Sequence, residues 1–168
     1  MNLLINTIMS GFASVGYSLL YRSPKNSLLG NFVTGATGML VYKILWDQVG
    51  MTFGAYLAAS VVIGIVAEIF ARVNKLPATV FLASGLIPLV PGLAIYNMMN
   101  AFATKNFNEA VFNIANAGIY ALGLALGVVL SSIFSKSLNN YRTYFKKVQE
   151  KRFVKRQMNK DKDKSIQK

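Results

Sequence analysis

Residues 76–104 read LPATVFLASGLIPLVPGLAIYNMMNAFAT, an apolar stretch long enough to cross a bilayer, and two prolines and a glycine interrupt its centre. Proline lacks a backbone donor and clashes with the carbonyl group four residues earlier, so a helix cannot run smoothly through Pro88, Pro91 and Gly92. Inside the bilayer, backbone groups that lose their helical hydrogen-bond partners have no water to bond instead. Such a break therefore persists only where other protein groups or a polar cavity supply those hydrogen bonds. A discontinuous span points to a solute site in a transporter. The alternative is a kink that only shapes helix packing. The sequence favours the solute site and the packing kink about equally.

The composition places the chain among membrane proteins. Hydrophobic residues make up 54% of its 168 residues, and its mean hydropathy is +0.41. We therefore expect an all-α, polytopic helical bundle in the lipid bilayer and not a soluble core. The sequence has no cysteine and no histidine, which removes thiolate metal sites, cysteine nucleophiles and Ser-His catalysis. We expect no enzyme activity, no metal site and no cofactor.

Hydropathy and turn residues predict five spans, each near the roughly 20 residues that cross a hydrocarbon core of about 30 Å. The expected spans are residues 1–21, 27–46, 51–71, the broken stretch 76–104, and 109–134. Together they form a transmembrane domain over residues 1–135. The first span has no charged segment before it, so we expect it to be retained and not cleaved as a signal peptide.

The positive charge is concentrated in a tail, residues 136–168, which holds twelve Lys and Arg against three acidic residues. Basic residues also occupy the first loop (Arg22, Lys25) and the third loop (Arg72, Lys75). Lys and Arg mark cytoplasmic loops, so five crossings place the N-terminus outside and the C-terminus in the cytoplasm of a plasma-membrane protein. The tail is expected to be a basic amphipathic helix followed by a disordered end. No nucleic-acid-binding fold accompanies it, and we expect no nucleic-acid partner.

One face of the fifth span is polar in its first half and small in its second. Steps of three or four residues align seven side chains on that face: Glu109, Asn113, Asn116, Tyr120, Gly123, Gly127 and Ser131. The GxxxG pattern in the second half favours close packing against another helix. Buried amides in lipid need partners, so the polar half either packs against a neighbouring helix or contacts a solute.

Pairs of small residues four apart predict similar packing faces in three other spans: Ser10 with Ser14, Thr34 with Gly38, and Ser60 with Gly64. They predict a tight bundle. A small-residue groove that this bundle leaves unfilled would serve subunit contacts, including contacts with further copies of the chain.

The sequence resembles the signature of the threonine/serine exporter family, in particular its short, separately encoded integral-membrane subunit. The resemblance lies in residues 77–81 (PATVF), in residues 85–92 (GLIPLVPG), and in Tyr96 and Met99, and it covers roughly residues 5–135. One departure is the loop at residues 21–24 (YRSP), where the family has an Asn-x-Pro type of turn, so no role of that Asn carries over to Arg22. The lysine-rich tail lies beyond the family core.

The resemblance implies export of small hydroxylated amino acids or small dicarboxylates, together with a larger partner membrane subunit. Both kinds of solute carry a carboxylate, and a half-helix that starts near Gly92 would direct unpaired N–H groups and the positive end of its dipole at the break. Carbonyl groups near Gly85, or amides such as Asn97 and Asn116, would meet the other polar end. The expected solute-binding residues are Gly85, Pro88, Pro91, Gly92, Tyr96, Asn97, Asn113, Asn116 and Tyr120. The competing interpretation is a membrane scaffold or assembly subunit that transports nothing.

The charge distribution gives a testable topology. A reporter domain fused after Lys168 should be cytoplasmic, and one fused before Met1 should be external, because the basic loops and tail share one side. Protease protection of each reporter in intact cells measures this directly. Two termini on the same side of the membrane would rule out five crossings.

Overall fold

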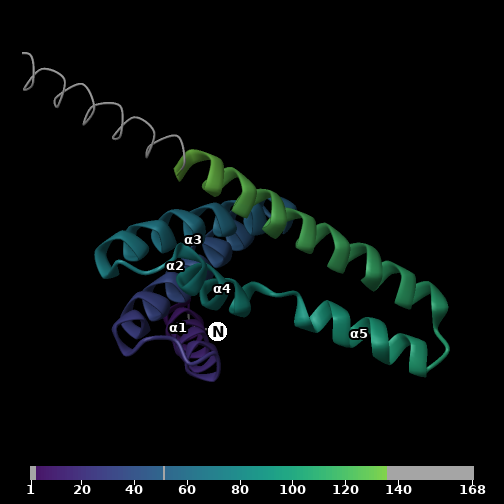
Figure 1. Ribbon diagram of the computed structural model, residues 1–168. Coiled ribbons are helices and arrows are strands. Elements are labelled where there is room, and N and C mark those ends of the chain that lie inside the picture. Colours follow the sequence, from purple (N-terminus) through teal and green to yellow (C-terminus); the bar gives the residue numbers. More distant parts are fainter. Residues whose placement is uncertain (1–2, 51, 136–168) are drawn as a thin grey trace, which may run out of the picture. The chain divides into compact units, whose positions relative to one another are not determined.

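The computed structural model describes residues 3–50 and 52–135, and this part of the chain is helical without β-strands (Figure 1). Its elements are α1 (Leu3–Leu20), the 3₁₀ turn η1 (Lys25–Ser27), α2 (Leu28–Val49), α3 (Thr52–Asn74), α4 (Ala78–Leu86), the 3₁₀ turn η2 (Ile87–Leu89), α5 (Gly92–Ala103), and a helix at Phe107–Ser135. Among the described residues, four helices are long and apolar enough to cross a membrane, and α4 with α5 forms a bent fifth candidate. The expected helical membrane bundle is therefore confirmed. The expected tail, residues 136–168, lies outside the described residues.

Tight turns end the helices and reverse the chain. After α1, Arg22 has a left-handed backbone (φ 52°), and the Ser23 N–H bonds the Ser18 carbonyl at 3.0 Å. The same Schellman arrangement follows α3 at Lys75 and α5 at Lys105. Gly50 (φ 64°) closes α2 with a bond from its N–H to the Trp46 carbonyl. Consequently α1, α2, α3 and α4 run alternately up and down through short connections, and a further turn reverses the chain after α5.

The helices pack closely in the order of the chain. Helix α1 lies against α2, α2 lies against α3, and α4 contacts all three of them. One end of this bundle therefore carries the α1–α2 and α3–α4 turns, and the other end carries the α2–α3 turn. The basic residues Arg22, Lys25, Arg72 and Lys75 all fall at the first end. There Arg72 pairs with Glu68 at 2.9 Å, one helical turn apart.

Small residues allow these close approaches, as the spacing predicted. A methyl group added at Gly35 of α2 would overlap the Ser14 hydroxyl of α1, and the Ser10 hydroxyl donates to the Gly35 carbonyl at 2.9 Å. The Phe107–Ser135 helix packs against α3 in the same way. A methyl group at Gly127 would overlap the Ser60 hydroxyl and approach the Leu57 carbonyl oxygen to 2.6 Å. The prediction of a packing role for the GxxxG half of this helix is confirmed.

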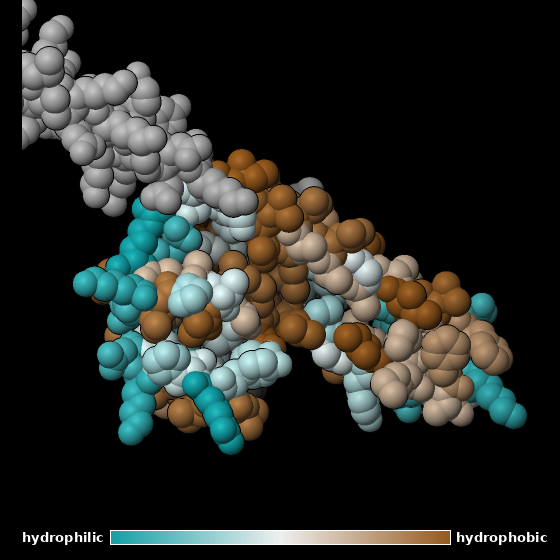
Figure 2. Space-filling model, viewed as in Figure 1, coloured by the Kyte–Doolittle hydropathy of each residue, from teal (hydrophilic) through white to brown (hydrophobic). Residues whose placement is uncertain are grey.

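The outer surface suits contact with lipid. Large apolar side chains lie exposed on the helix flanks, among them Leu4 at 70%, Leu20 at 82% and Leu29 at 72%. Figure 2 shows hydrophobic surface over these flanks, with hydrophilic side chains gathered where the α1–α2 and α3–α4 turns lie. A surface of this kind is stable in hydrocarbon and costly in water.

The contact at Gly127 predicts a difference between two glycines of one helix. Gly127→Ala should destabilise the protein by about 1–3 kcal/mol, because a backbone carbonyl on α3 cannot move aside to admit the methyl group. Gly118→Ala is the matched control, since nothing lies within 4 Å of the methyl position there. Thermal unfolding of both variants in detergent measures the difference. Equal unfolding temperatures would contradict the proposed close contact with α3.

Candidate functional site

The broken span changes direction over a few residues. Helix α4 ends at Leu86 and continues as the turn η2, whose last bond runs from the Val90 N–H to the Ile87 carbonyl at 3.2 Å. Val90 and Pro91 then separate the two halves, and the axes of the halves meet at 49°. Proline cannot donate the bond that would continue the ladder at Pro91. The predicted discontinuity is therefore present at the predicted residues.

Helix α5 begins at the break with unpaired donors. The Gly92 N–H is taken by the Val90 carbonyl at 2.7 Å, and the Ile95 N–H is taken by the Pro91 carbonyl at 3.2 Å. Within the described residues, the N–H groups of Leu93 and Ala94 have no backbone acceptor. Free N–H groups and the helix dipole make such a terminus attractive to a carboxylate. The sequence predicts unpaired N–H groups at a half-helix that starts near Gly92. In the structure these groups belong to Leu93 and Ala94, the two residues that follow Gly92.

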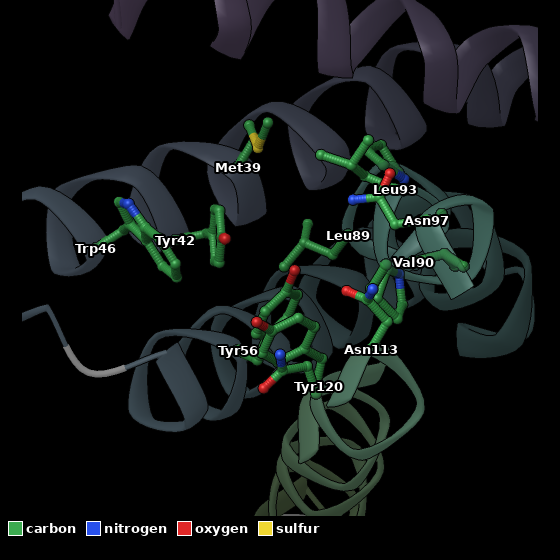
Figure 3. A pocket seen from close by; sticks show the side chains of 15 residues that line it. Met39, Tyr42, Trp46, Tyr56, Leu89, Val90, Leu93, Asn97, Asn113 and Tyr120 are labelled. Carbon is green, nitrogen blue, oxygen red and sulfur yellow. The ribbon is translucent and has the colours of Figure 1, made fainter. Parts of the chain in front are cut away.

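A pocket of about 400 Å³ opens at this point (Figure 3). The break contributes the backbone and side chains of residues 88–94 to its lining. Three amides, Asn97, Asn113 and Asn116, come from α5 and the Phe107–Ser135 helix. The remaining lining is Met39, Tyr42 and Trp46 of α2, Tyr56 of α3, and Tyr120. The volume falls within the range of small-molecule sites, about 300–1,000 Å³.

Aromatic rings from three helices form one wall of the pocket. Tyr56 and Tyr120 stack with ring centroids 4.9 Å apart and planes at 20°. Tyr42 lies against Tyr56 at 4.7 Å, and Trp46 follows Tyr42 at 5.9 Å. Tyr56 itself is only 8% exposed, so it anchors the stack in the protein core. Ring faces carry a negative quadrupole and attract a cation such as an ammonium group.

The amides form a second polar group beside that wall. Figure 3 shows Asn97 and Asn113 close to each other, with the tyrosine rings nearby. Asn113 donates to the Glu109 carbonyl at 3.0 Å, which orients its side chain. In the described part of the chain, the side chains of Asn97 and Asn116 make no hydrogen bond, although both line the pocket. Two amides are therefore free to bind a polar solute.

The pocket is electrically neutral. None of its fifteen lining residues has a charged side chain. A charged solute would consequently be held by backbone N–H groups, amide dipoles and ring faces and not by ion pairs. Asp47 and Glu109 are both exposed and do not line the pocket.

Seven of the nine residues expected to bind solute line this pocket: Pro88, Pro91, Gly92, Asn97, Asn113, Asn116 and Tyr120. Two lie elsewhere. Gly85 is buried in the contact of α4 with α2, where a methyl group would approach Thr34 Cγ2 to 2.6 Å. Tyr96 is 66% exposed on α5 and does not line the pocket.

Sequence reasoning missed the aromatic wall contributed by α2 and α3. Tyr42 and Trp46 are four residues apart, which places them on one helical face, but this spacing also fits an ordinary interfacial aromatic belt. Tyr56 is the only tyrosine of α3. Only the packing of α2, α3 and the Phe107–Ser135 helix brings the three tyrosines together.

The fold and the site together define a helical membrane protein whose broken span opens on a neutral pocket of amides and aromatic rings. The family model described as "Threonine/Serine exporter, ThrE" matches residues 6–134, and the chain belongs to this family. The chain is 28% identical over 145 residues to a threonine/serine exporter of Corynebacterium glutamicum, covering 83% of this chain and 29% of that protein. It is 28% identical over 144 residues to a probable threonine/serine exporter of Mycobacterium tuberculosis, covering 82% and 27%. The chain thus spans less than a third of these curated relatives, and no solved structure matches it significantly.

Proposed function

We propose that the chain is the small subunit of a secondary transporter that exports small carboxylate-bearing solutes, with threonine and serine as the first candidates and small dicarboxylates as the second. The observation that carries this proposal is the junction of free α5 donors, two unbonded amides and an aromatic wall in one pocket. A scaffold would need no unbonded amides at that position. Its broken span could equally be packed in aliphatic side chains.

The pocket chemistry suits an amino acid better than a dicarboxylate. The carboxylate would accept from the N–H groups of Leu93 and Ala94, and a hydroxyl group would exchange hydrogen bonds with Asn97 or Asn116. The ammonium group would lie against the rings of Tyr42 and Tyr120, since no carboxylate lines the pocket. A dicarboxylate would bring a second negative charge to ring faces that repel it.

We further propose that a larger membrane subunit completes the transporter. The curated relatives are more than three times as long as the segment that this chain matches, so most of their length lies outside the match. The pocket also lacks a carboxylate or histidine that could carry a coupling proton. The larger subunit would supply that group. The proposed orientation has the N-terminus outside and the basic end of the bundle in the cytoplasm.

Solute efflux tests the function. Cells that express this chain together with a candidate larger subunit should export preloaded, labelled threonine faster than cells that express either chain alone. Succinate efflux in parallel cultures decides between the two solute classes. Equal efflux with and without this chain, despite its presence in the membrane, would assign it to the scaffold class.

The break is tested by replacing Pro88, Pro91 and Gly92 together with alanine. Alanine restores backbone donors and helix propensity, so α4 and α5 should join in one continuous ladder. Two charge-assisted hydrogen bonds of about 1.5 kcal/mol each would then be lost, and solute affinity should fall on the order of 100-fold. Efflux at subsaturating threonine measures the loss, and surface biotinylation controls for insertion. A variant that inserts, assembles and exports at the normal rate would show that the break serves architecture alone.

The amide side is tested by Asn116→Leu, which keeps the side-chain size and removes the hydrogen-bonding groups. One lost bond to a polar or charged solute group predicts roughly a tenfold decrease in affinity. Asn100→Leu is the matched control, because Asn100 is exposed on α5 and does not line the pocket. Normal efflux by the Asn116 variant would show that the polar face of the Phe107–Ser135 helix serves packing and not solute binding.

A further inference from the structure

A second polar pocket lies at the other half of the broken span. It has a volume of about 230 Å³ and lies between the end of α1 and the first turns of α4. Six of its lining residues carry hydroxyl groups: Tyr17, Ser18, Tyr21, Ser23, Thr79 and Ser84. Like the pocket at the break, it has no charged residue in its lining.

The two pockets lie toward opposite ends of the bundle. The second pocket takes residues from the end of α1 and the start of α4, and the short turns place those segments at the same end. The pocket at the break takes the end of α2 and the start of α3, which lie at the other end. Each pocket therefore uses one half of the broken span. Arg22, Lys25 and Lys75 give the end that holds the second pocket a positive field, which attracts carboxylates.

A buried polar group behind the second pocket still lacks a partner. Asn31 of α2 is fully buried and donates from Nδ2 to the Ser18 hydroxyl at 2.6 Å, but its Oδ1 has no donor among the described residues. Exchanging the amide oxygen and nitrogen would leave a buried N–H₂ group unpaired instead. In either orientation one buried polar atom of the amide requires a water molecule or another polar group as its partner. This region of the span is therefore expected to be hydrated.

A tightly packed segment separates the pockets. Between Ser84 and Pro88, a methyl group at Gly85 would come within 2.6 Å of Thr34 and 3.2 Å of Ile63. Ile63 is fully buried and packs in one cluster with Leu89, which is 3% exposed. The structure thus has a polar pocket on each side of a dry barrier. Movement of α4 relative to α5 at the break would open the barrier from one side or the other.

We infer that the pocket between α1 and α4 is a second solute site. This site binds a hydroxylated amino acid from the cytoplasm before the amino acid reaches the pocket at the break. This inference rests on the proposed transport function. The hydroxyl groups of Ser23 and Thr79 replace the water of the solute's polar groups, and the positive end of the bundle raises its local concentration. The solute then crosses only the short barrier at Thr34, Ile63 and Leu89.

The absence of cysteine from this sequence allows a direct test by labelling single cysteines, because within this chain only the introduced thiol can react. Ala83→Cys and, as a second variant, Ser23→Cys report the α1–α4 pocket, and Asn97→Cys reports the pocket at the break. Ala125→Cys is the control, since Ala125 is exposed on the helix flank and lines neither pocket. Each variant is co-expressed with the larger subunit. A membrane-impermeant maleimide is then added to intact cells or to inside-out vesicles.

The Ala83 and Ser23 variants should be labelled from the cytoplasmic side and the Asn97 variant from the opposite side, while the Ala125 variant stays unlabelled. Saturating threonine should slow labelling of the Ala83 variant several-fold. Labelling of both pockets from the same side, or of neither Ala83 nor Ser23 variant, would overturn the inference. So would a labelling rate that neither threonine, serine nor succinate changes. The sidedness of labelling does not depend on efflux, so absent efflux with opposite-sided labelling would reject the proposed function while leaving the two pockets in place.

Discussion

A peptide group inside a bilayer finds no water, so each backbone donor and acceptor there must bond within the protein or face a polar cavity. Four helices of the described region meet this demand with their own ladders. The broken span does not, because Pro88 and Pro91 withhold two donors and the start of α5 leaves the N–H groups of Leu93 and Ala94 without acceptors. The pocket at the break, with its amides and phenols, gives these N–H groups polar surroundings. The rest of the bundle holds the pocket in place.

Close packing through small residues holds the helices of this arrangement against one another. The Ser14–Gly35 contact joins α1 to α2, and the Gly127–Ser60 and Gly64–Ser131 contacts join α3 to the Phe107–Ser135 helix. Hydrocarbon offers no hydrophobic drive for helices to associate, so van der Waals contact and interhelical hydrogen bonds must supply it. The second half of the Phe107–Ser135 helix is thereby fixed on α3. Its first half carries Asn113, Asn116 and Tyr120 to the pocket.

Much of the architecture could be predicted from the sequence, because the hydropathy of a span and the effect of proline on a helix depend only on neighbouring residues. The expected spans agree with the observed helices to within a few residues, and the break falls at Pro88–Gly92 as expected. The helical spacing of Asn113, Asn116 and Tyr120 correctly placed them on one face. Spacing within one helix says nothing about which helix lies opposite, so the contributions of Tyr42 and Tyr56 could not be predicted. The sequence likewise does not show which helix lies against Gly85. It therefore predicts that Gly85 binds solute with its neighbours at the break, whereas Gly85 packs against Thr34 of α2.

The aromatic wall has a spectroscopic consequence. The chain contains a single tryptophan, Trp46, and that residue lines the pocket at the break with its ring 5.9 Å from Tyr42. Indole emission responds to the polarity and quenching groups around the ring, and Trp46 is 39% exposed. The tryptophan emission of the protein therefore comes from one known position beside the broken span. The protein carries its own optical reporter of whether that pocket is dry, hydrated or filled.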